Sequence, residues 1–256
     1  MFNSRCILIL VILALLSGCA AKVEPIPKKD VYPSMYEEAP ASILILPPIN
    51  LTTAADAKIF YSTTIQEPLS GFGYYTFPFP IIEEILKHEG IYDTQQLYEI
   101  PVDKFKEYFG AEAVLFTKIT DWDVAYAVIG SYLTVGFEGE IRSTTTNDVL
   151  WKNKSVITVD LSGGNSGGGL AGLLAKMIVA AINTAKADYV PYARLANYRL
   201  FSPIPVGKYH AKFGLDKEEL IYAPIDGVVL NNAPVANIDM ESNSTAALAD
   251  APSSEE

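Results

Sequence analysis

The side chain with the clearest chemistry in this sequence is the thiol of Cys19, because of the residues that precede it. Arg5 is followed by an apolar run from Cys6 to Leu16, and Ser-Gly then leads directly to Cys19. A charged start, a short apolar run and small residues before a cleavage site are typical of a secretory signal. The alternative is a membrane-spanning helix, but a span needs about 20 apolar residues, more than this run contains. We therefore predict a signal peptide over residues 1–18.

The same segment resembles the lipobox of bacterial lipoprotein signals. This resemblance implies that the chain is cut between Gly18 and Cys19, that Cys19 receives a diacylglycerol thioether, and that the new amino terminus is acylated, for example with palmitate. Several acyl chains hold a protein stably on a membrane. By the sorting rule of enteric lipoproteins, Ala20 in place of Asp implies the outer membrane. The expected location is the bacterial cell envelope, with the protein lipid-anchored at the outer membrane and facing the periplasm or the surface.

A glycine-rich stretch, Gly163–Gly169, precedes a predicted helix and is a second candidate for chemistry. Backbone amides at the start of a helix can bind phosphate. The stretch lacks the Gly-Lys-Ser/Thr ending of a P-loop, however, and it follows a strand predicted to be antiparallel. Ser166 inside it lacks the Gly-x-Ser-x-Gly pattern of a nucleophile elbow. A flexible connector is therefore the favoured interpretation.

The remaining candidates are the two histidines and one pair of carboxylates. His88 and His210 have no partner at the spacing of metal ligands, so no metal site is predicted. Glu138 and Glu140 would lie about 7 Å apart on one strand face, a separation that a glycosidase could use. Solvated alternation along a strand explains the pair better. We expect no catalytic residues, no cofactor and no enzymatic activity.

The composition favours a packed, acidic globule. Half of the residues are hydrophobic and the formal net charge is −11, which argues against binding to nucleic acid. Cys6 leaves with the signal peptide, so Cys19 is the only cysteine of the processed chain and no internal disulfide is possible. The remaining residues, about 240, suffice for one large domain or two small ones.

The first half of the processed chain divides into a tether and helices around buried strands. Residues 19–41 contain four prolines among charged residues and are predicted to form an extended tether, with an ordered first strand as the alternative. An α/β domain is predicted over residues 42–215. It begins with the apolar run Ile43–Leu46, which is typical of a strand buried on both faces. Helices are expected over residues 54–66, from Pro80 to a stop at Gly90, and over residues 102–109.

Residues 131–161 alternate between apolar and polar side chains and predict an antiparallel hairpin with one solvated face. Val149 and Trp151 are expected on its buried face. The segment 170–187 is apolar almost all round, so we expect a helix that is buried either centrally or against a partner. Residues 216–256 are predicted to be a C-terminal extension, disordered beyond about residue 231. The side chains proposed for self-association of the apolar helix are Leu170, Leu173, Leu174, Met177 and Ile178.

Several short motifs occur in a characteristic order: Ile43-Leu-Ile-Leu-Pro-Pro-Ile-Asn50, then Gly73-Tyr-Tyr75, Pro78 and Gly110-Ala-Glu-Ala-Val-Leu115. With the lipobox, they resemble a family of bacterial lipoproteins, sometimes noted as surface antigens, that is related to CsgG and the amino-terminal domain of TolB. The resemblance covers about residues 1–215. It implies an α/β (α+β) fold with a mixed sheet flanked by helices, an envelope location and no established activity. It supplies no catalytic residues.

The function expected from these features is that of a structural or accessory component of an envelope assembly, built as a homo-oligomer or with CsgG-like lipoproteins. Contact with a membrane would be through the lipid. An oligomeric secretion pore is the first alternative, with the 131–161 hairpins inserted in a membrane. Asn153 and Ser155 interrupt the lipophilic face that such a hairpin needs. An envelope hydrolase is the second alternative, and no constellation of residues supports it.

Overall fold

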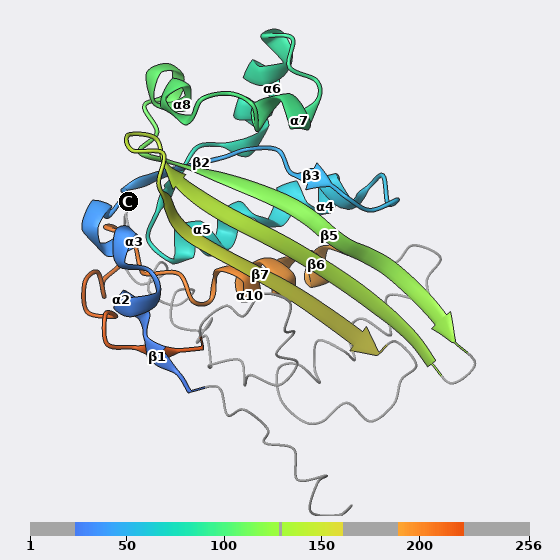
Figure 1. Cartoon of the computed structure of the whole chain (residues 1–256). Coiled ribbons are helices and arrows are strands. Elements are labelled where there is room, and N and C mark those ends of the chain that lie inside the picture. The colour runs from blue at the N-terminus through green and yellow to red at the C-terminus, as the bar shows by residue number, and fades with distance from the viewer. Residues whose placement is uncertain (1–23, 128–129, 161–188, 223–256) are drawn as a thin grey trace, which may run out of the picture. The chain divides into compact units, whose positions relative to one another are not determined.

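The computed structural model describes residues 24–127, 130–160 and 189–222, and its centre is a six-stranded mixed β-sheet (Figure 1). The strands are β2 (Ser42–Ile45), β3 (Ile49–Asn50), β4 (Tyr75–Thr76), β5 (Ala113–Ala127), β6 (Gly130–Ser143) and β7 (Val149–Asp160). β2 lies between β4 and β5 and is parallel to both, and β3 also pairs with β5 in parallel. β5, β6 and β7 are antiparallel. The mixed sheet and its antiparallel hairpin are therefore confirmed.

Eight helices and a small second ladder surround this sheet within the described ranges. The ladder consists of β1 (Ile26–Pro27) and β8 (Leu220–Ile221). The helices are α2 (Lys28–Val31), α3 (Pro33–Glu38), α4 (Ala57–Thr64), α5 (Gln66–Gly71), α6 (Phe79–His88), α7 (Thr94–Leu97), α8 (Val102–Phe109) and α10 (Val190–Phe201). Pro80 lies in the first turn of α6, and Gly110 ends α8 in the left-handed conformation, as their residue types favour.

The helix predicted over residues 54–66 is two helices in the structure. α4 ends at Thr64, and α5 begins at Gln66 with Pro68 in its first turn. A proline is tolerated there because the first backbone amides of a helix have no partner inside it. The chain can therefore restart a helix at the position where we expected it to end or kink.

β2 divides the hydrophobic core into two layers. Ile43 and Ile45 pack with residues of α4, α5 and α10, whereas Leu44 and Leu46 pack with residues of α6, α7 and α8. Figure 1 shows these two groups of helices on opposite faces of the sheet. The side chains of Ile43–Leu46 are all fully buried, so the prediction of a strand buried on both faces is confirmed.

The β6–β7 hairpin has one buried and one solvated face, as predicted. Phe137 of β6 and Trp151 of β7 lie in the core with α10, and polar residues occupy the opposite face. The expectation that Val149 shares the buried face with Trp151 is wrong, because Val149 is exposed. The register shifts between Ile141 and Arg142, and this irregularity puts Leu150 in the core instead.

The prediction of an extended tether over residues 19–41 is wrong for residues 24–41. This segment forms β1, α2 and α3, and it buries Tyr32 and Met35 against the core. The ring of Tyr32 lies 6.3 Å from that of Trp151. Pro33 begins α3, where its fixed φ suits the first helical turn. The tether was predicted from the prolines and charges of this segment, and that prediction gave no weight to the apolar residues that pack it against the core.

The folded body also extends beyond residue 215, which we predicted as its end. β8 pairs with β1, and Ile221 packs against the main core. Among the described residues, no helix is long and apolar enough to cross a membrane.

Several sequence predictions concern residues outside the described ranges. They are the signal peptide with its cleavage site at Gly18, the lipid attachment at Cys19, the sorting residue Ala20, the Gly163–Gly169 stretch, the apolar helix over 170–187 and the C-terminal tail beyond residue 231. These remain predictions.

Buried tyrosines predict how stability depends on alkaline pH. Tyr61 is fully buried and donates a hydrogen bond to Thr117 Oγ1 at 2.8 Å, and burial raises its pKa well above the ordinary value. Burial likewise raises the pKa of Tyr98, whose hydroxyl donates to the Thr117 carbonyl oxygen at 2.5 Å. The unfolded chain loses these protons near pH 10. We therefore expect the free energy of unfolding to be unaffected by these groups below about pH 10 and to fall above it.

Chemical denaturation at a series of pH values, with tyrosinate absorbance recorded in parallel, measures this effect. The Tyr61→Phe variant is the control, and it should lose less stability than the parent between about pH 10 and pH 12. An equal pH dependence in both proteins would contradict the assignment.

Candidate functional site

The most distinctive site of the described residues is the place where the N-terminal segment meets the C-terminal one. β1 and β8 are antiparallel, with Ile26 opposite Ile221. The ladder continues as the Lys28 amide donates to the Glu219 carbonyl oxygen at 2.8 Å, and the Lys29 amide donates to that of Lys217 at 3.1 Å. We call residues 26–29 with residues 216–221 the clasp. It joins parts of the chain that lie almost 200 positions apart.

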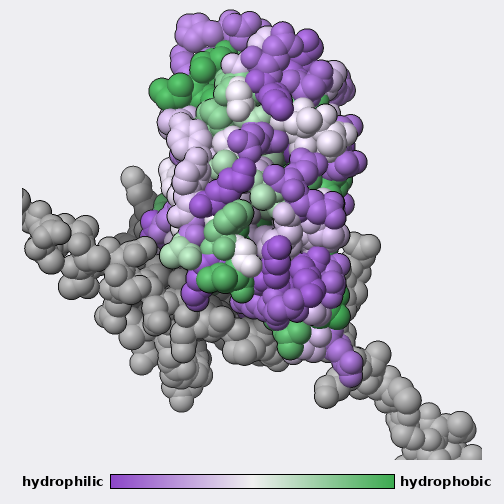
Figure 2. Space-filling model, turned by 90° about the vertical axis from the view of Figure 1, so that its left-hand side faces the viewer, coloured by the Kyte–Doolittle hydropathy of each residue, from purple (hydrophilic) through white to green (hydrophobic). Residues whose placement is uncertain are grey.

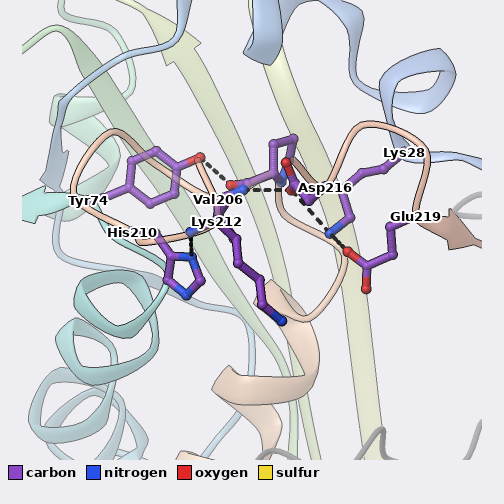
Figure 3. A network of polar contacts seen from close by, with 8 residues as sticks. Lys28, Tyr74, Val206, His210, Lys212, Asp216 and Glu219 are labelled. Carbon is purple, nitrogen blue, oxygen red and sulfur yellow. Dashed lines mark hydrogen bonds and ion pairs between the residues drawn. The ribbon is translucent and has the colours of Figure 1, made fainter. Parts of the chain in front are cut away.

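A buried ion pair lies at the centre of the clasp (Figure 3). Lys28 is 3% exposed, and its Nζ lies 3.4 Å from Asp216 Oδ2 and 2.6 Å from Glu219 Oε2. Asp216 is 6% exposed, and its Oδ2 also accepts a hydrogen bond from the Val206 amide at 2.9 Å. A buried lysine is stable only when it is paired, because removing its charge from water is costly. The pair therefore fixes both segments in one geometry.

A tyrosine from α3 adds to this buried polar cluster. Burial is the main cause that raises the pKa of Tyr36, and the neighbouring Asp216 carboxylate raises it further. The phenol therefore stays protonated. Tyr36 OH and Asp216 Oδ1 each lack a hydrogen-bond partner of good geometry among the described residues. The Lys217 Nζ lies 5.7 Å from the centre of the Tyr36 ring, within the range of a cation–π contact. Three elements therefore contribute charge or polarity to one small region.

The loop that leads into the clasp is fastened to the end of α5. The hydroxyl of Tyr74 donates to the Pro205 carbonyl oxygen at 2.5 Å, and the Tyr209 amide donates to that of Gly73 at 3.0 Å. Gly73 has a φ of +83°, and a Cβ there would lie 2.4 Å from the His210 backbone nitrogen. Only glycine fits such an approach of two backbones without strain. This contact holds the loop against the body.

The histidines do not meet in one site. His88 lies on the solvent side of α6, and its Nε2 is 3.4 Å from Glu84 of the same helix. His210 Nδ1 accepts a hydrogen bond from the Lys212 amide at 3.1 Å within its own loop (Figure 3). Over residues 24–127, 130–160 and 189–222, no group of three or more His, Cys, Asp or Glu side chains could hold a metal ion.

The two carboxylates proposed for a glycosidase arrangement are paired with cations. Lys152 Nζ lies 3.5 Å from Glu138 Oε1 and 3.7 Å from Glu140 Oε2. Arg142 Nε donates to Glu140 Oε1 at 2.5 Å. These side chains line one wall of a groove of about 670 Å³, whose other side includes Tyr98 and residues at the start of α8. The arrangement is that of an ion-paired sheet surface, which agrees with the solvated interpretation.

Sequence analysis missed the clasp. Lys28 and Asp216 are 188 positions apart, and neither belongs to a motif. The available signal was the apolar content of the segment around Tyr32 and Met35, which a solvated tether would not need. A lysine beside such residues can be recognised as buried only when its partner is known.

The fold and the clasp define a class of protein, a mixed α/β domain whose N-terminal segment is fastened to its body. The chain belongs to the family described as "Putative lipoprotein GNA1162-like", whose family model matches residues 31–208. The matched range covers the sheet and its helices. The residues of the clasp, 26–29 and 216–221, lie just outside it.

A relative in Neisseria meningitidis supports this membership. The chain is 30% identical over 197 residues to "Putative lipoprotein NMB1124/NMB1162" of Neisseria meningitidis serogroup B, which spans 77% of this chain and 90% of the relative. The crystal structure of lipoprotein GNA1162 from Neisseria meningitidis is similar at 30% identity with a TM-score of 0.46, over 56% of this chain and 99% of that one. A PelC dodecamer from Paraburkholderia phytofirmans is similar at 15% identity with a TM-score of 0.40, over 66% of this chain and 89% of that one.

Replacing Lys28 by Met should destabilise the protein strongly. The substitution keeps most of the side-chain volume but leaves the Asp216 carboxylate buried without a cation. Breaking a buried ion pair in this way costs about 3 to 5 kcal/mol. Chemical denaturation measures the loss, and hydrogen exchange should show that amides of residues 26–29 lose protection.

Lys29→Met is the matched control, because Lys29 pairs with Glu218 at the surface. Exposed pairs contribute little, so this variant should unfold close to the parent. Equal losses in the two variants would show that burial of the Lys28 pair is not what fastens the clasp.

Gly73→Ala should also loosen the loop that carries the clasp. The new Cβ would meet the His210 backbone, and the positive φ adds strain, so we expect a loss of more than about 2 kcal/mol. Gly71→Ala is the control two residues away, because a Cβ at Gly71 has nothing within 4 Å. Thermal unfolding distinguishes them. A Gly73→Ala protein as stable as Gly71→Ala would mean that the two backbones can separate at little cost.

Proposed function

We propose that this chain is a lipid-anchored protein of the bacterial envelope, attached through Cys19 at the outer membrane. It acts there as a structural or accessory component of an envelope assembly and not as an enzyme. Membership in a lipoprotein family supports the attachment, together with the signal-like residues 1–18 and the cysteine that follows them.

The observation that carries the proposal is the clasp. Seven positions separate Cys19 from Ile26, the first residue of β1. A fully extended chain of that length spans at most about 25 Å. A lipid on Cys19 would therefore hold the folded body next to the membrane surface. The clasp gives the anchor a rigid point of attachment on the domain, which suits a protein that takes part in an assembly at the membrane.

Assembly is favoured over catalysis by the surface of the described residues. The groove beside β6 and β7 is lined by carboxylates that already have cationic partners. Glu138 and Glu140 are therefore engaged with the cations of the sheet surface, where a catalytic carboxylate would have to reach a substrate. Self-association through residues 170–178 and association with CsgG-like lipoproteins remain part of this proposal.

The β6–β7 hairpin argues against the pore alternative. Its inner face packs on α10, where Asn153 Nδ2 donates to the Leu200 carbonyl oxygen at 2.6 Å. Its outer face carries the ion pairs of Glu138 and Glu140 with Lys152. Insertion would have to detach α10 and would still leave polar side chains on both faces, and lipid-facing charge is costly near the bilayer midplane. We therefore favour an accessory role over a pore.

Lipid attachment is tested by substituting the two cysteines of the full chain separately. Cys19→Ser should abolish metabolic labelling with palmitate and release the protein from the membrane fraction, because no thiol remains at the predicted cleavage site. Cys6→Ser is the matched control, since Cys6 lies within the predicted signal, and it should keep both label and location. Retention of palmitate or of membrane sedimentation by Cys19→Ser would overturn the proposal.

A further inference from the structure

Large apolar side chains gather at the surface around the clasp. Four of the fourteen exposed ones among the described residues fall within ten consecutive positions, 213–222. Leu215 is 79% exposed and Leu220 is 60% exposed, although both are leucines. We call this set the anchor-side patch. It consists of Phe213, Leu215, Leu220 and Tyr222.

The ladder between β1 and β8 explains part of this arrangement. Alternate residues of a strand point to opposite faces. Ile221 packs against the main core, so its neighbours Leu220 and Tyr222 point away from the core and into solvent. Figure 2 looks onto the side of the molecule that carries α2, α3 and the C-terminal loop, and it shows hydrophobic areas between hydrophilic ones low on this face. Apolar side chains are therefore accessible beside the clasp.

The position of the anchor indicates what covers the patch. The chain enters the body at Ile26, directly beside β8, and a lipid on Cys19 lies at most about 25 Å of extended chain away. The side of the domain around β1 and β8 is therefore the one that the anchor brings to the bilayer. Leucine, phenylalanine and tyrosine side chains gain free energy when they enter the boundary between headgroups and acyl chains.

Charge does not oppose this contact. The whole chain has a net charge of −11, but residues 24–30 and 206–222 hold five lysines and five carboxylates. Several of these charges are paired with each other, as Lys28 is with Asp216 and Lys29 is with Glu218. The region around the patch is therefore close to neutral and is neither repelled nor strongly attracted by anionic headgroups.

We propose that the anchor-side patch docks onto the interfacial layer of the lipid bilayer, so that the domain rests on the membrane with one fixed face. This inference rests on the proposed lipid at Cys19. A lipid chain and an apolar patch that lies close to it act as two attachments on one membrane. The short chain between the lipid and the domain keeps the patch at a high local concentration of bilayer, so a few side chains suffice to bind the patch to the membrane.

A fluorescent label on the patch tests the docking. In the lipidated full chain after processing, Cys19 is occupied, so Leu215→Cys introduces the only free thiol. We would attach the fluorophore NBD to it and reconstitute the protein in phosphatidylcholine vesicles that contain a headgroup-labelled nitroxide lipid. The expected result is a blue-shifted emission and quenching several-fold stronger than at the control position.

Ile81→Cys is the matched control, because Ile81 is a large apolar residue of α6 with 57% exposure. Figure 1 shows α6 on the side of the described body remote from β1. Adding Leu220→Asp to the Leu215→Cys protein should reduce quenching at position 215, since the carboxylate opposes burial in the interface. Leu220 is exposed, so this change should leave the thermal unfolding midpoint nearly unchanged.

The outcomes separate this inference from the function on which it rests. Equal quenching at positions 215 and 81, with the lipid confirmed by mass and the protein floating with vesicles, would overturn the docking alone. A blue shift at position 215 without quenching would mean that protein covers the patch, either a second copy or another chain, and would also overturn it. A measured protein mass that lacks the lipid would overturn both the docking and the lipid attachment at Cys19.

Discussion

The buried pair of Lys28 and Asp216 is the interaction on which the arrangement of this protein depends. Lys28 would be unstable in the core without its carboxylate partners, Asp216 and Glu219, and the buried Asp216 carboxylate would be unstable there without a cation. A buried pair of this kind contributes less to net stability than to the choice of one geometry, since breaking it costs far more than replacing it with apolar residues would. The pair thereby decides where the N-terminal segment enters the domain.

The rest of the fold follows from apolar patterns that are strong within short stretches. The run Ile43–Leu46, which forms most of β2, is apolar at four consecutive positions, and a strand of that kind needs helices on both sides. The helices from Pro78 to Gly110 cover one face, and α4, α5 and α10 cover the other. β6 and β7 alternate instead, so only one of their faces is covered by α10 and the other is ion-paired and open to water. Local sequence periodicity was therefore enough to predict β2 and the β6–β7 hairpin, whereas the mixed sheet as a whole was expected from the family resemblance.

The features that the sequence did not reveal are those that depend on distant partners. β1 and β8 have two residues each, which is too short for any periodic pattern, and their pairing spans almost 200 positions. The prolines and charges around Lys28 predicted a solvated tether, and only contact with Asp216 and the core made helix formation favourable. The prediction for Val149 was wrong for a related reason. The β-bulge that changes the face of Val149 lies next to the turn between two strands, and the alternating pattern does not show it.

The length of free chain before β1 determines how an anchored domain can behave. A tether over residues 19–41 would have allowed the body to move about 80 Å from its lipid, with its orientation unconstrained. With β1 beginning at Ile26, the free length falls to about 25 Å. A domain on so short a link cannot turn freely, because most orientations would drive its surface into the bilayer. With the proposed lipid on Cys19, the ion pair of Lys28 would act on function as well as on the fold, by limiting which residues the anchored molecule can present to a partner.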